Sequence, residues 1–175
     1  MSKKGYMVEQ RISAKDVEAL NESAVAVTDI DSGTLVTLGA FSKDVYTVTK
    51  ATTGVGNYMA YSPSELLIEV EGTLIPKPVA DPRAYTNLAG RTFNIFKPQV
   101  GDRIGLTDGN IKTGETVAIG KFLEQTADGY VVKDTPTAST TSLEVSDIKT
   151  QPFPQSGGSF GMEFAKLYVC RVAQN

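Results

Sequence analysis

Residues 100–134 read VGDRIGLTDGNIKTGETVAIGKFLEQTADGYVVKD, and this stretch indicates the fold more clearly than any other part of the chain. Short apolar segments alternate here with polar turns at Asp108-Gly109-Asn110 and Asp128-Gly129. Asp, Asn and Gly tolerate the positive φ angles of tight hairpin turns. The stretch therefore predicts roughly three or four antiparallel strands.

The same texture continues on the N-terminal side of this stretch. AVAVTDI and TLVTLGAF lie on either side of Asp31-Ser32-Gly33, which predicts a hairpin with its turn at these residues. Residues 45–49 are β-branched or aromatic throughout and predict another strand. Two more strands are predicted at residues 66–70 and 73–75, with a bend at Glu71-Gly72 between them.

The C-terminal part of the chain supplies the last strands. Residues 92–96, 142–150 and 162–172 each show a strand pattern. The middle of the last segment is apolar on both faces, from Phe164 onward, so we place it in the centre of a sheet. Together the segments predict a mainly β fold of about ten short antiparallel strands, arranged as a sandwich or a barrel, with little helix.

The N-terminal segment lacks this alternation. We divide the chain into an N-terminal arm, residues 1–22, and a single β domain, residues 23–175. Within the arm, Ser13 could cap a helix of at most about two turns, and an extended arm with a local turn is the alternative. The prolines of residues 76–82 lack the amide hydrogen that a central strand needs, so they predict an excursion from the β domain.

Composition and charge narrow the range of functions. The chain has 175 residues, 41% apolar and 21% charged, with a formal net charge of −3. Nucleic acids are normally bound by clustered Lys and Arg, so we expect no nucleic-acid partner. No run approaches the ~20 apolar residues of a membrane span, and residues 1–16 do not resemble a secretory signal. We therefore expect no membrane partner and folding in a cytoplasm.

The side chains that most often carry catalysis are scarce. The chain has no histidine, no tryptophan and one cysteine, Cys170. Histidine is the commonest general base near neutral pH and the commonest metal ligand. A single cysteine allows neither an intramolecular disulfide nor a cysteine-based zinc site, and its place in a strand predicts a buried apolar residue. We predict that the protein is not an enzyme and needs no cofactor.

Carboxylates keep alternatives open. The Asp29-Ile30-Asp31 segment could bind a hard cation, although a solvated turn explains the same residues. Glu69 with Glu71, or Asp102 with Asp108, could form the acid and base of a carboxylate-dependent hydrolase. A carbohydrate-binding or adhesion β-sandwich module is the other alternative. The lack of tryptophan counts against it, because sugars usually stack on aromatic rings.

Three stretches resemble small β-rich virion proteins. They are SAVAVTDIDSGTLVTLGAF (residues 23–41), PQVGDRIGLTDGNIKTGETVAIGKFLEQTADGYVV (residues 98–132) and FAKLYVCRVAQN (residues 164–175). In this succession of short strands and polar turns, the chain resembles the decoration, or cement, proteins that tailed bacteriophages add to the outside of their capsids. The resemblance implies a non-enzymatic β domain, often trimeric, that bridges capsid subunits with an N-terminal arm. It transfers no functional residue, because no family motif is present.

Two apolar groups have no obvious local core and are predicted to bind a partner. They are Tyr6, Met7 and Val8 in the polar arm, and Phe153 and Phe160 in a connector rich in proline and glycine. Either group could instead pack on its own domain. We expect a decoration protein on the capsid surface of a virion, with the major capsid protein as its partner and a homo-oligomer, favouring a trimer. Residues 1–12 of the arm are expected to be mobile before binding, because their few apolar side chains do not offset a backbone ordering cost of roughly 1–2 kcal/mol per residue.

Overall fold

The computed structural model describes residues 4–53, 55, 58–61, 67–70, 73–76, 81–154 and 161–175. Within these residues the fold is mainly β, as predicted, and the helices are short 3-10 turns. The strands are β1 (Met7–Arg11), β2 (Asn21–Ala26), β3 (Leu35–Ser42), β4 (Val45–Lys50), β5 (Tyr58–Tyr61), β6 (Leu67–Val70), β7 (Thr73–Pro76), β8 (Thr92–Phe96), β9 (Arg103–Thr107), β10 (Phe122–Thr126), β11 (Gly129–Lys133), β12 (Ser142–Pro154) and β13 (Met162–Gln174). The 3-10 turns are η1 (Ser13–Lys15), η2 (Glu18–Leu20), η3 (Pro82–Ala84) and η4 (Asp108–Asn110).

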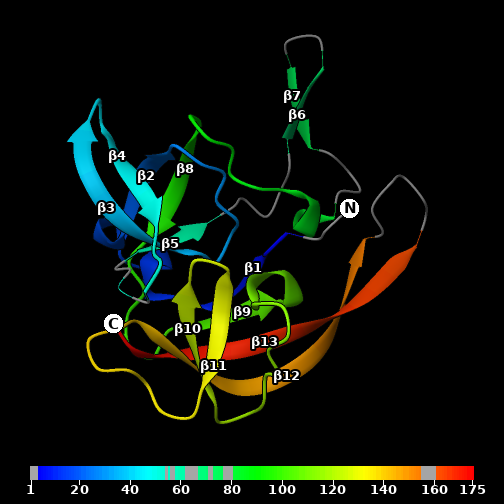
Figure 1. The fold of residues 1–175 in the computed structure, drawn as a ribbon. Coiled ribbons are helices and arrows are strands. Elements are labelled where there is room, and N and C mark those ends of the chain that lie inside the picture. Colours follow the sequence, from blue (N-terminus) through cyan, green and yellow to red (C-terminus); the bar gives the residue numbers. More distant parts are fainter. Residues whose placement is uncertain are drawn as a thin grey trace.

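Eleven of these strands form two sheets (Figure 1). One is a six-stranded sheet in the order β1-β9-β13-β12-β10-β11, and the other is a closed barrel in the order β2-β4-β3-β5-β8. The strand pairs are antiparallel except for β2 and β4, which run parallel. β6 and β7 form a separate two-stranded hairpin.

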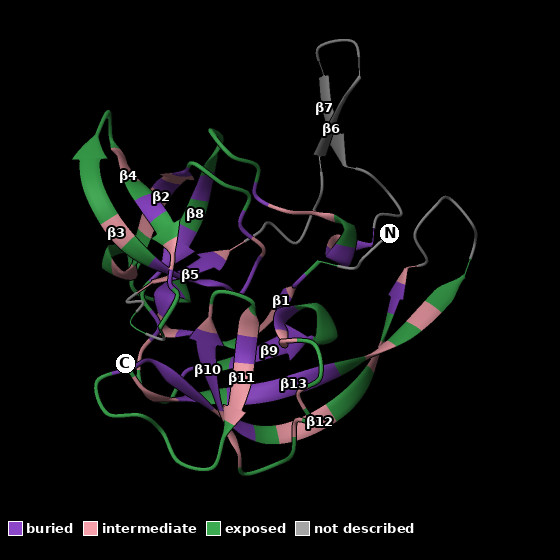
Figure 2. Cartoon of the chain, in the orientation of Figure 1, coloured by how far each residue is buried: buried purple, intermediate pink, exposed green. Residues whose placement is uncertain are grey.

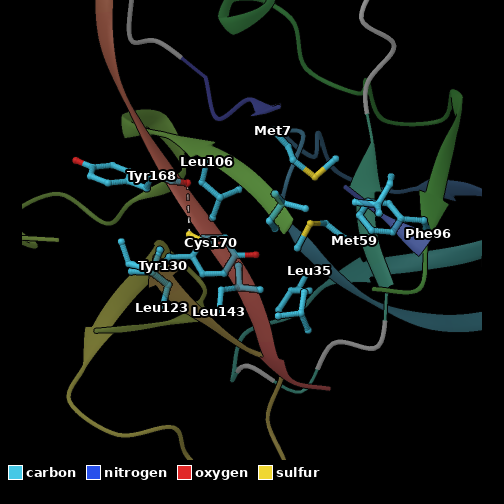
Figure 3. Close-up of a cluster of buried hydrophobic side chains, with 14 of the residues drawn as sticks. Met7, Leu35, Met59, Phe96, Leu106, Leu123, Tyr130, Leu143, Tyr168 and Cys170 are labelled. Carbon is cyan, nitrogen blue, oxygen red and sulfur yellow. Dashed lines mark hydrogen bonds between the residues drawn. The ribbon is translucent and has the colours of Figure 1, made fainter. Parts of the chain in front are cut away.

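The main core lies between the barrel and the six-stranded sheet (Figure 3). Leu35 and Met59 enter it from the barrel, and Leu106 and Leu143 enter it from the sheet. The residue after each barrel residue points the other way, as strand geometry requires, so a second buried cluster fills the barrel itself. Full burial of a large apolar side chain contributes about 1.5–3 kcal/mol, so the shared layer holds the two sheets together.

β12 and β13 extend beyond the rest of their sheet (Figure 1). β10 pairs with β12 only near Ser142, and β9 pairs with β13 only from Leu167 to Arg171. Residues 150–154 and 162–166 pair with each other and, within the described part of the chain, with no third strand. We call these two segments the outer arm.

Several predicted strands are confirmed. The segments at residues 45–49 and 92–96 are β4 and β8, and the two C-terminal segments are β12 and β13. β13 occupies a central position in its sheet, as predicted. β6 and β7 pair as predicted, while the Glu71-Gly72 bend lies outside the described residues. β7 ends at Pro76 and η3 begins at Pro82, so no described strand crosses the proline-rich excursion.

The hairpin predicted at Asp31-Ser32-Gly33 is wrong. In the barrel β4 separates β2 from β3. Gly33 does turn the chain, with a φ of 83°, but its N–H donates to the Ala60 carbonyl at 2.8 Å. Its own carbonyl accepts from the Tyr130 hydroxyl at 2.8 Å. The turn therefore connects the barrel to the other sheet. Its backbone hydrogen bonds are made with Ala60 and Tyr130, which are distant in the sequence.

The other two turns of the opening stretch differ from each other. Asp128-Gly129 closes the β10–β11 hairpin, as predicted. Asp108-Gly109-Asn110 instead forms the 3-10 turn η4, and the next strand, β10, begins only at Phe122. The Asn110 side chain explains the difference, because its amide donates to the Ser32 carbonyl at 2.7 Å and ties the turn to the barrel side.

The described part of the predicted arm, residues 4–22, pairs and packs with the rest of the fold. β1 pairs with β9 at the sheet edge, and the Met7 side chain is only 1% exposed. Ser13 begins a 3-10 turn, but its side chain does not cap that turn. The Ser13 amide and hydroxyl donate to Asp102 Oδ1 at 2.9 and 2.6 Å. These hydrogen bonds and the burial of Met7 offset the conformational entropy that this segment loses when it is ordered.

Candidate binding surfaces

The outer arm carries an exposed apolar face. Residues directly opposite each other in an antiparallel pair place their side chains on the same face. Pro152 is opposite Phe164 and Pro154 is opposite Met162, so these four side chains share one face. Phe164 is 68% exposed and Met162 is 65% exposed, and Figure 2 shows the exposed outer part of β13. Contiguous exposed apolar side chains are a common feature of protein-association sites, so this face is a candidate binding surface.

The opposite face of the outer arm packs against its own chain. Phe153 is buried, and the ring of Tyr6 meets it edge-on with the centroids 6.4 Å apart. The guanidinium carbon of Arg83 lies 4.4 Å from the centroid of the Phe153 ring. Edge-on aromatic pairs and cations over aromatic faces are both attractive. Phe153 therefore fixes the outer arm to the N-terminal segment and to η3.

Arg83 is the centre of a buried ionic cluster beneath the outer arm. Its Nε and one terminal nitrogen donate to the two Asp81 carboxylate oxygens at 2.9 and 2.8 Å. The same terminal nitrogen donates to Glu163 of β13 at 3.3 Å. The backbone carbonyl of Arg83 accepts from the Lys4 amide at 2.9 Å. A planar guanidinium suits such two-pronged carboxylate contacts, so η3, β13 and the N-terminal segment are held in one arrangement.

The structure places the predicted partner-binding residues differently from one another. Met7 and Phe153 are buried, so the expectation that they lack a core of their own is wrong. Tyr6 and Val8 are half-buried, and partner binding by them stays a prediction. Phe160 lies outside the described residues. Buried Met7 and Phe153 side chains cannot contact a partner without local unfolding.

Sequence reasoning missed the exposed face of the outer arm. Phe164 was expected in a strand buried on both faces, yet burial begins only at Leu167, where β9 joins β13. The sequence holds one signal for the difference, because Met162 and Phe164 alternate with Glu163. That alternation indicates one apolar and one polar face.

The carboxylates of the possible cation site face different segments. Asp29 accepts from the Ala89 amide at 2.9 Å, and Asp31 accepts from the Gly5 amide at 3.1 Å. Among the described residues, no three Asp, Glu or Cys side chains are grouped as a metal site would require. Both carboxylates act as backbone acceptors that join loops.

The carboxylates of the hydrolase alternative are also engaged in local structure. Asp102 accepts from the Gln99 amide at 2.8 Å in addition to its two bonds from Ser13. Asp108 hydrogen-bonds the Tyr168 hydroxyl, and burial together with this bond raises the pKa of Tyr168 to about 12. Glu71 lies outside the described residues, so the structure gives no distance between Glu69 and Glu71.

Cys170 is buried in the main core, as predicted. Its thiol donates to the Tyr168 carbonyl at 3.4 Å, and burial raises its pKa to about 12. The thiolate is the reactive form of cysteine, so this environment keeps the side chain inert near neutral pH.

A further recess lies between β1 and the barrel, with a volume of about 850 Å³. Carboxylates are the majority of the charged side chains that line it: Glu9, Glu18, Glu22 and Asp44, with Lys15 as the single cation among its described lining. The Tyr61 hydroxyl hydrogen-bonds Glu9. Burial is the larger cause and this bond the smaller cause of the raised pKa of Tyr61. We call this recess the β1 cleft.

Comparison with protein-family models, with curated proteins and with solved structures found no match to this chain. Within the described part, no helix has the length and apolar character needed to cross a membrane.

Proposed function

We propose that the protein is a non-enzymatic structural protein of a virion, which binds the outside of the capsid as a decoration protein and stabilises the shell. The outer arm carries this proposal, because one of its faces is anchored by Phe153 and Arg83 while the other presents Phe164 and Met162 to solvent. Five residues of extended strand reach roughly 17 Å, enough to contact a neighbouring subunit.

Energetics suit a partner that is present in many copies. Burial of Phe164 and Met162 contributes about 1.5–3 kcal/mol each, which is small against the cost of association for a single contact. On a regular shell the same contact recurs, and linked contacts bind far more tightly than one alone. Binding only to the assembled shell then stabilises that shell by mass action.

Purified virus particles provide the direct test. Mass spectrometry and cryo-electron microscopy are expected to find the chain on the outer surface of the shell, with the outer arm against the major capsid protein. Particles whose shells lack the chain would contradict the proposal. The proposal also includes a homo-oligomer, favouring a trimer, and light scattering of the purified protein measures this separately.

A pair of double variants tests the role of the outer arm. Met162→Ser with Phe164→Ser removes the apolar face, and Val100→Ser with Ile119→Ser removes two similarly exposed side chains elsewhere. Rebinding to particles stripped of the protein should weaken at least about tenfold for the first variant and stay within about twofold for the control. Equal affinities of the two variants would show that the outer arm does not make the contact.

A further inference from the structure

The β1 cleft has an open strand edge as one of its walls. β1 pairs with β9 on one side, and its other side faces the cleft, which Met7, Val8 and Glu9 line. The Tyr6 carbonyl accepts from the Thr107 amide at 3.1 Å, so Tyr6 is a hydrogen-bonded position of the ladder. Alternate residues of an antiparallel pair point their backbone groups to opposite sides.

It follows that the backbone N–H and C=O groups of Met7 and Glu9 point away from β9. Within the described part of the chain, no strand pairs with this side of β1. A bulge between Glu9 and Arg11 ends the regular ladder, so the open edge is short. An unpaired edge is a template for another extended chain, and peptide-binding domains use such edges for strand addition.

The charged side chains around the open edge of β1 determine which charge on a ligand the cleft favours. Glu18, Glu22 and Asp44 line the cleft together with Glu9, whereas Lys15 is the single described lining residue of positive charge and is already paired with Glu9. This excess of acid disfavours anionic ligands and nucleic acid, and it complements lysine or arginine. The volume of about 850 Å³ is comparable to sites that bury a ligand the size of a short peptide segment.

We propose that the β1 cleft binds an extended segment of a partner protein that carries lysine or arginine, and that this segment adds as a strand to the open edge of β1. Its backbone pairs with Met7 and Glu9, and its cations face Glu18 and Glu22. The inference does not depend on the partner being a capsid, because the recognition lies in the strand edge and its charge.

The test uses the full chain and short synthetic probes. The first probe is an acetylated and amidated octapeptide in which lysine alternates with valine, and the second replaces each lysine by glutamate. At low salt the lysine peptide should bind at least about tenfold more tightly in fluorescence anisotropy. Hydrogen exchange of the Met7 and Glu9 amides should slow when it is bound. No binding of the lysine peptide, or slowed exchange confined to other residues, would overturn the proposal.

N-methylated peptides separate strand addition from simple charge attraction. One version carries N-methyl groups on the lysine amides, and another carries them on the valine amides. Only one edge of an added strand faces β1, so one version should lose binding and the other should keep it. Equal binding of both versions would exclude strand addition, because charge attraction does not distinguish them.

Two double variants of equal charge change locate the site. Glu18→Gln with Glu22→Gln alters the cleft, and Asp128→Asn with Asp134→Asn removes the same charge at exposed positions outside the cleft lining. The first should weaken the lysine peptide by about tenfold, and the second by less than about twofold. Equal losses would show that net charge, and not the cleft, attracts the peptide.

Discussion

The inner and outer halves of the β12–β13 pair share one register but differ in environment. In the inner half, Leu143, Val145 and Cys170 are fully buried, because β9 and β10 flank the pair and the barrel covers it. In the outer half, Phe164 is largely exposed. Burial along the β12–β13 pair therefore depends on which strands lie beside it, and not on how apolar the two strands themselves are. Burial within this chain therefore does not account for the apolar residues of the outer half, and the partner binding that we propose would account for them.

The largest predicted effect concerns the ionic cluster that supports the outer half. Arg83→Ala leaves Asp81 buried without the guanidinium that pairs with it, and removal of one partner of a buried ion pair typically costs about 3–5 kcal/mol. We expect a loss of this size in the free energy of unfolding, measured by urea titration.

The inner half offers the matched control. Arg171 pairs with Glu144 at 2.6 Å across β13 and β12, but its side chain is largely exposed. Arg171→Ala should therefore cost less than about 1 kcal/mol. Losses of similar size for Arg83→Ala and Arg171→Ala would contradict the supporting role of the buried cluster.

The second prediction concerns the apolar support of the outer half. Phe153→Ala removes the ring that contacts Tyr6 and Arg83, and burial of a phenylalanine is typically worth about 3 kcal/mol or more against alanine. An isolated two-stranded hairpin is marginal in water, so the outer arm should open. Amide hydrogen exchange at Gln151 and Ala165 should accelerate about 100-fold.

Phe153→Leu is the control for this second prediction. Leucine keeps most of the apolar contact, so exchange in the outer arm should change much less than with alanine. Unchanged exchange in Phe153→Ala would show that the outer arm stands without the Phe153 contact.

The strands that the sequence predicts are those with local signals. β4 is β-branched or aromatic at nearly every position, and the β10–β11 hairpin turns locally at Ala127-Asp128, directly before Gly129 begins β11. By contrast, the place of β1 depends on β9, about a hundred residues away, and on a core that accepts Met7. The turn at Gly33 likewise depends on Ala60 and Tyr130. Such long-range pairing leaves little trace in the segment itself.

The candidate surfaces were less predictable than the fold. Arg83 gives no sequence signal for burial, because charged side chains are mostly exposed unless they are paired. Phe164 is placed in the core by the apolar residues that follow it, and only its alternation with Glu163 indicates otherwise, because the sequence does not reveal where β9 ends. The open edge of β1 also depends on strand order, and strand order is a property of the whole fold.

The third prediction tests how completely the inner half excludes water. Burial raises the pKa of the Cys170 thiol from its ordinary value of 9.0 to about 12. Between these values the unfolded chain loses this proton while the native chain keeps it, so the native state binds more protons. The free energy of unfolding is then highest below pH 9 and falls as pH rises toward 12, by up to about 1.4 kcal/mol per pH unit for this group.

Cys170→Ala isolates this contribution. Burial and, to a smaller extent, the neighbouring Cys170 also raise the pKa of Tyr130, which remains in both proteins, so the difference between their slopes reports the loss of the Cys170 thiol together with the change that this loss makes at Tyr130. Urea unfolding at several pH values from 8 to 11 should give a shallower decline for Cys170→Ala than for the unchanged chain. Identical declines would mean that the thiol is open to solvent in the native state.

The smallest predicted effect on stability concerns the exposed face of the outer half. Phe164→Ala removes a ring as large as that of Phe153, but this ring is 68% exposed and contacts solvent on the face opposite the Arg83 cluster. Substitutions at such surface positions usually change stability by less than about 0.5 kcal/mol. Urea titration should therefore show almost no change for Phe164→Ala, while Phe153→Ala is strongly destabilised. A large loss from Phe164→Ala would mean that this face already packs within the free protein or between its copies, and comparison of unfolding at two protein concentrations distinguishes those cases.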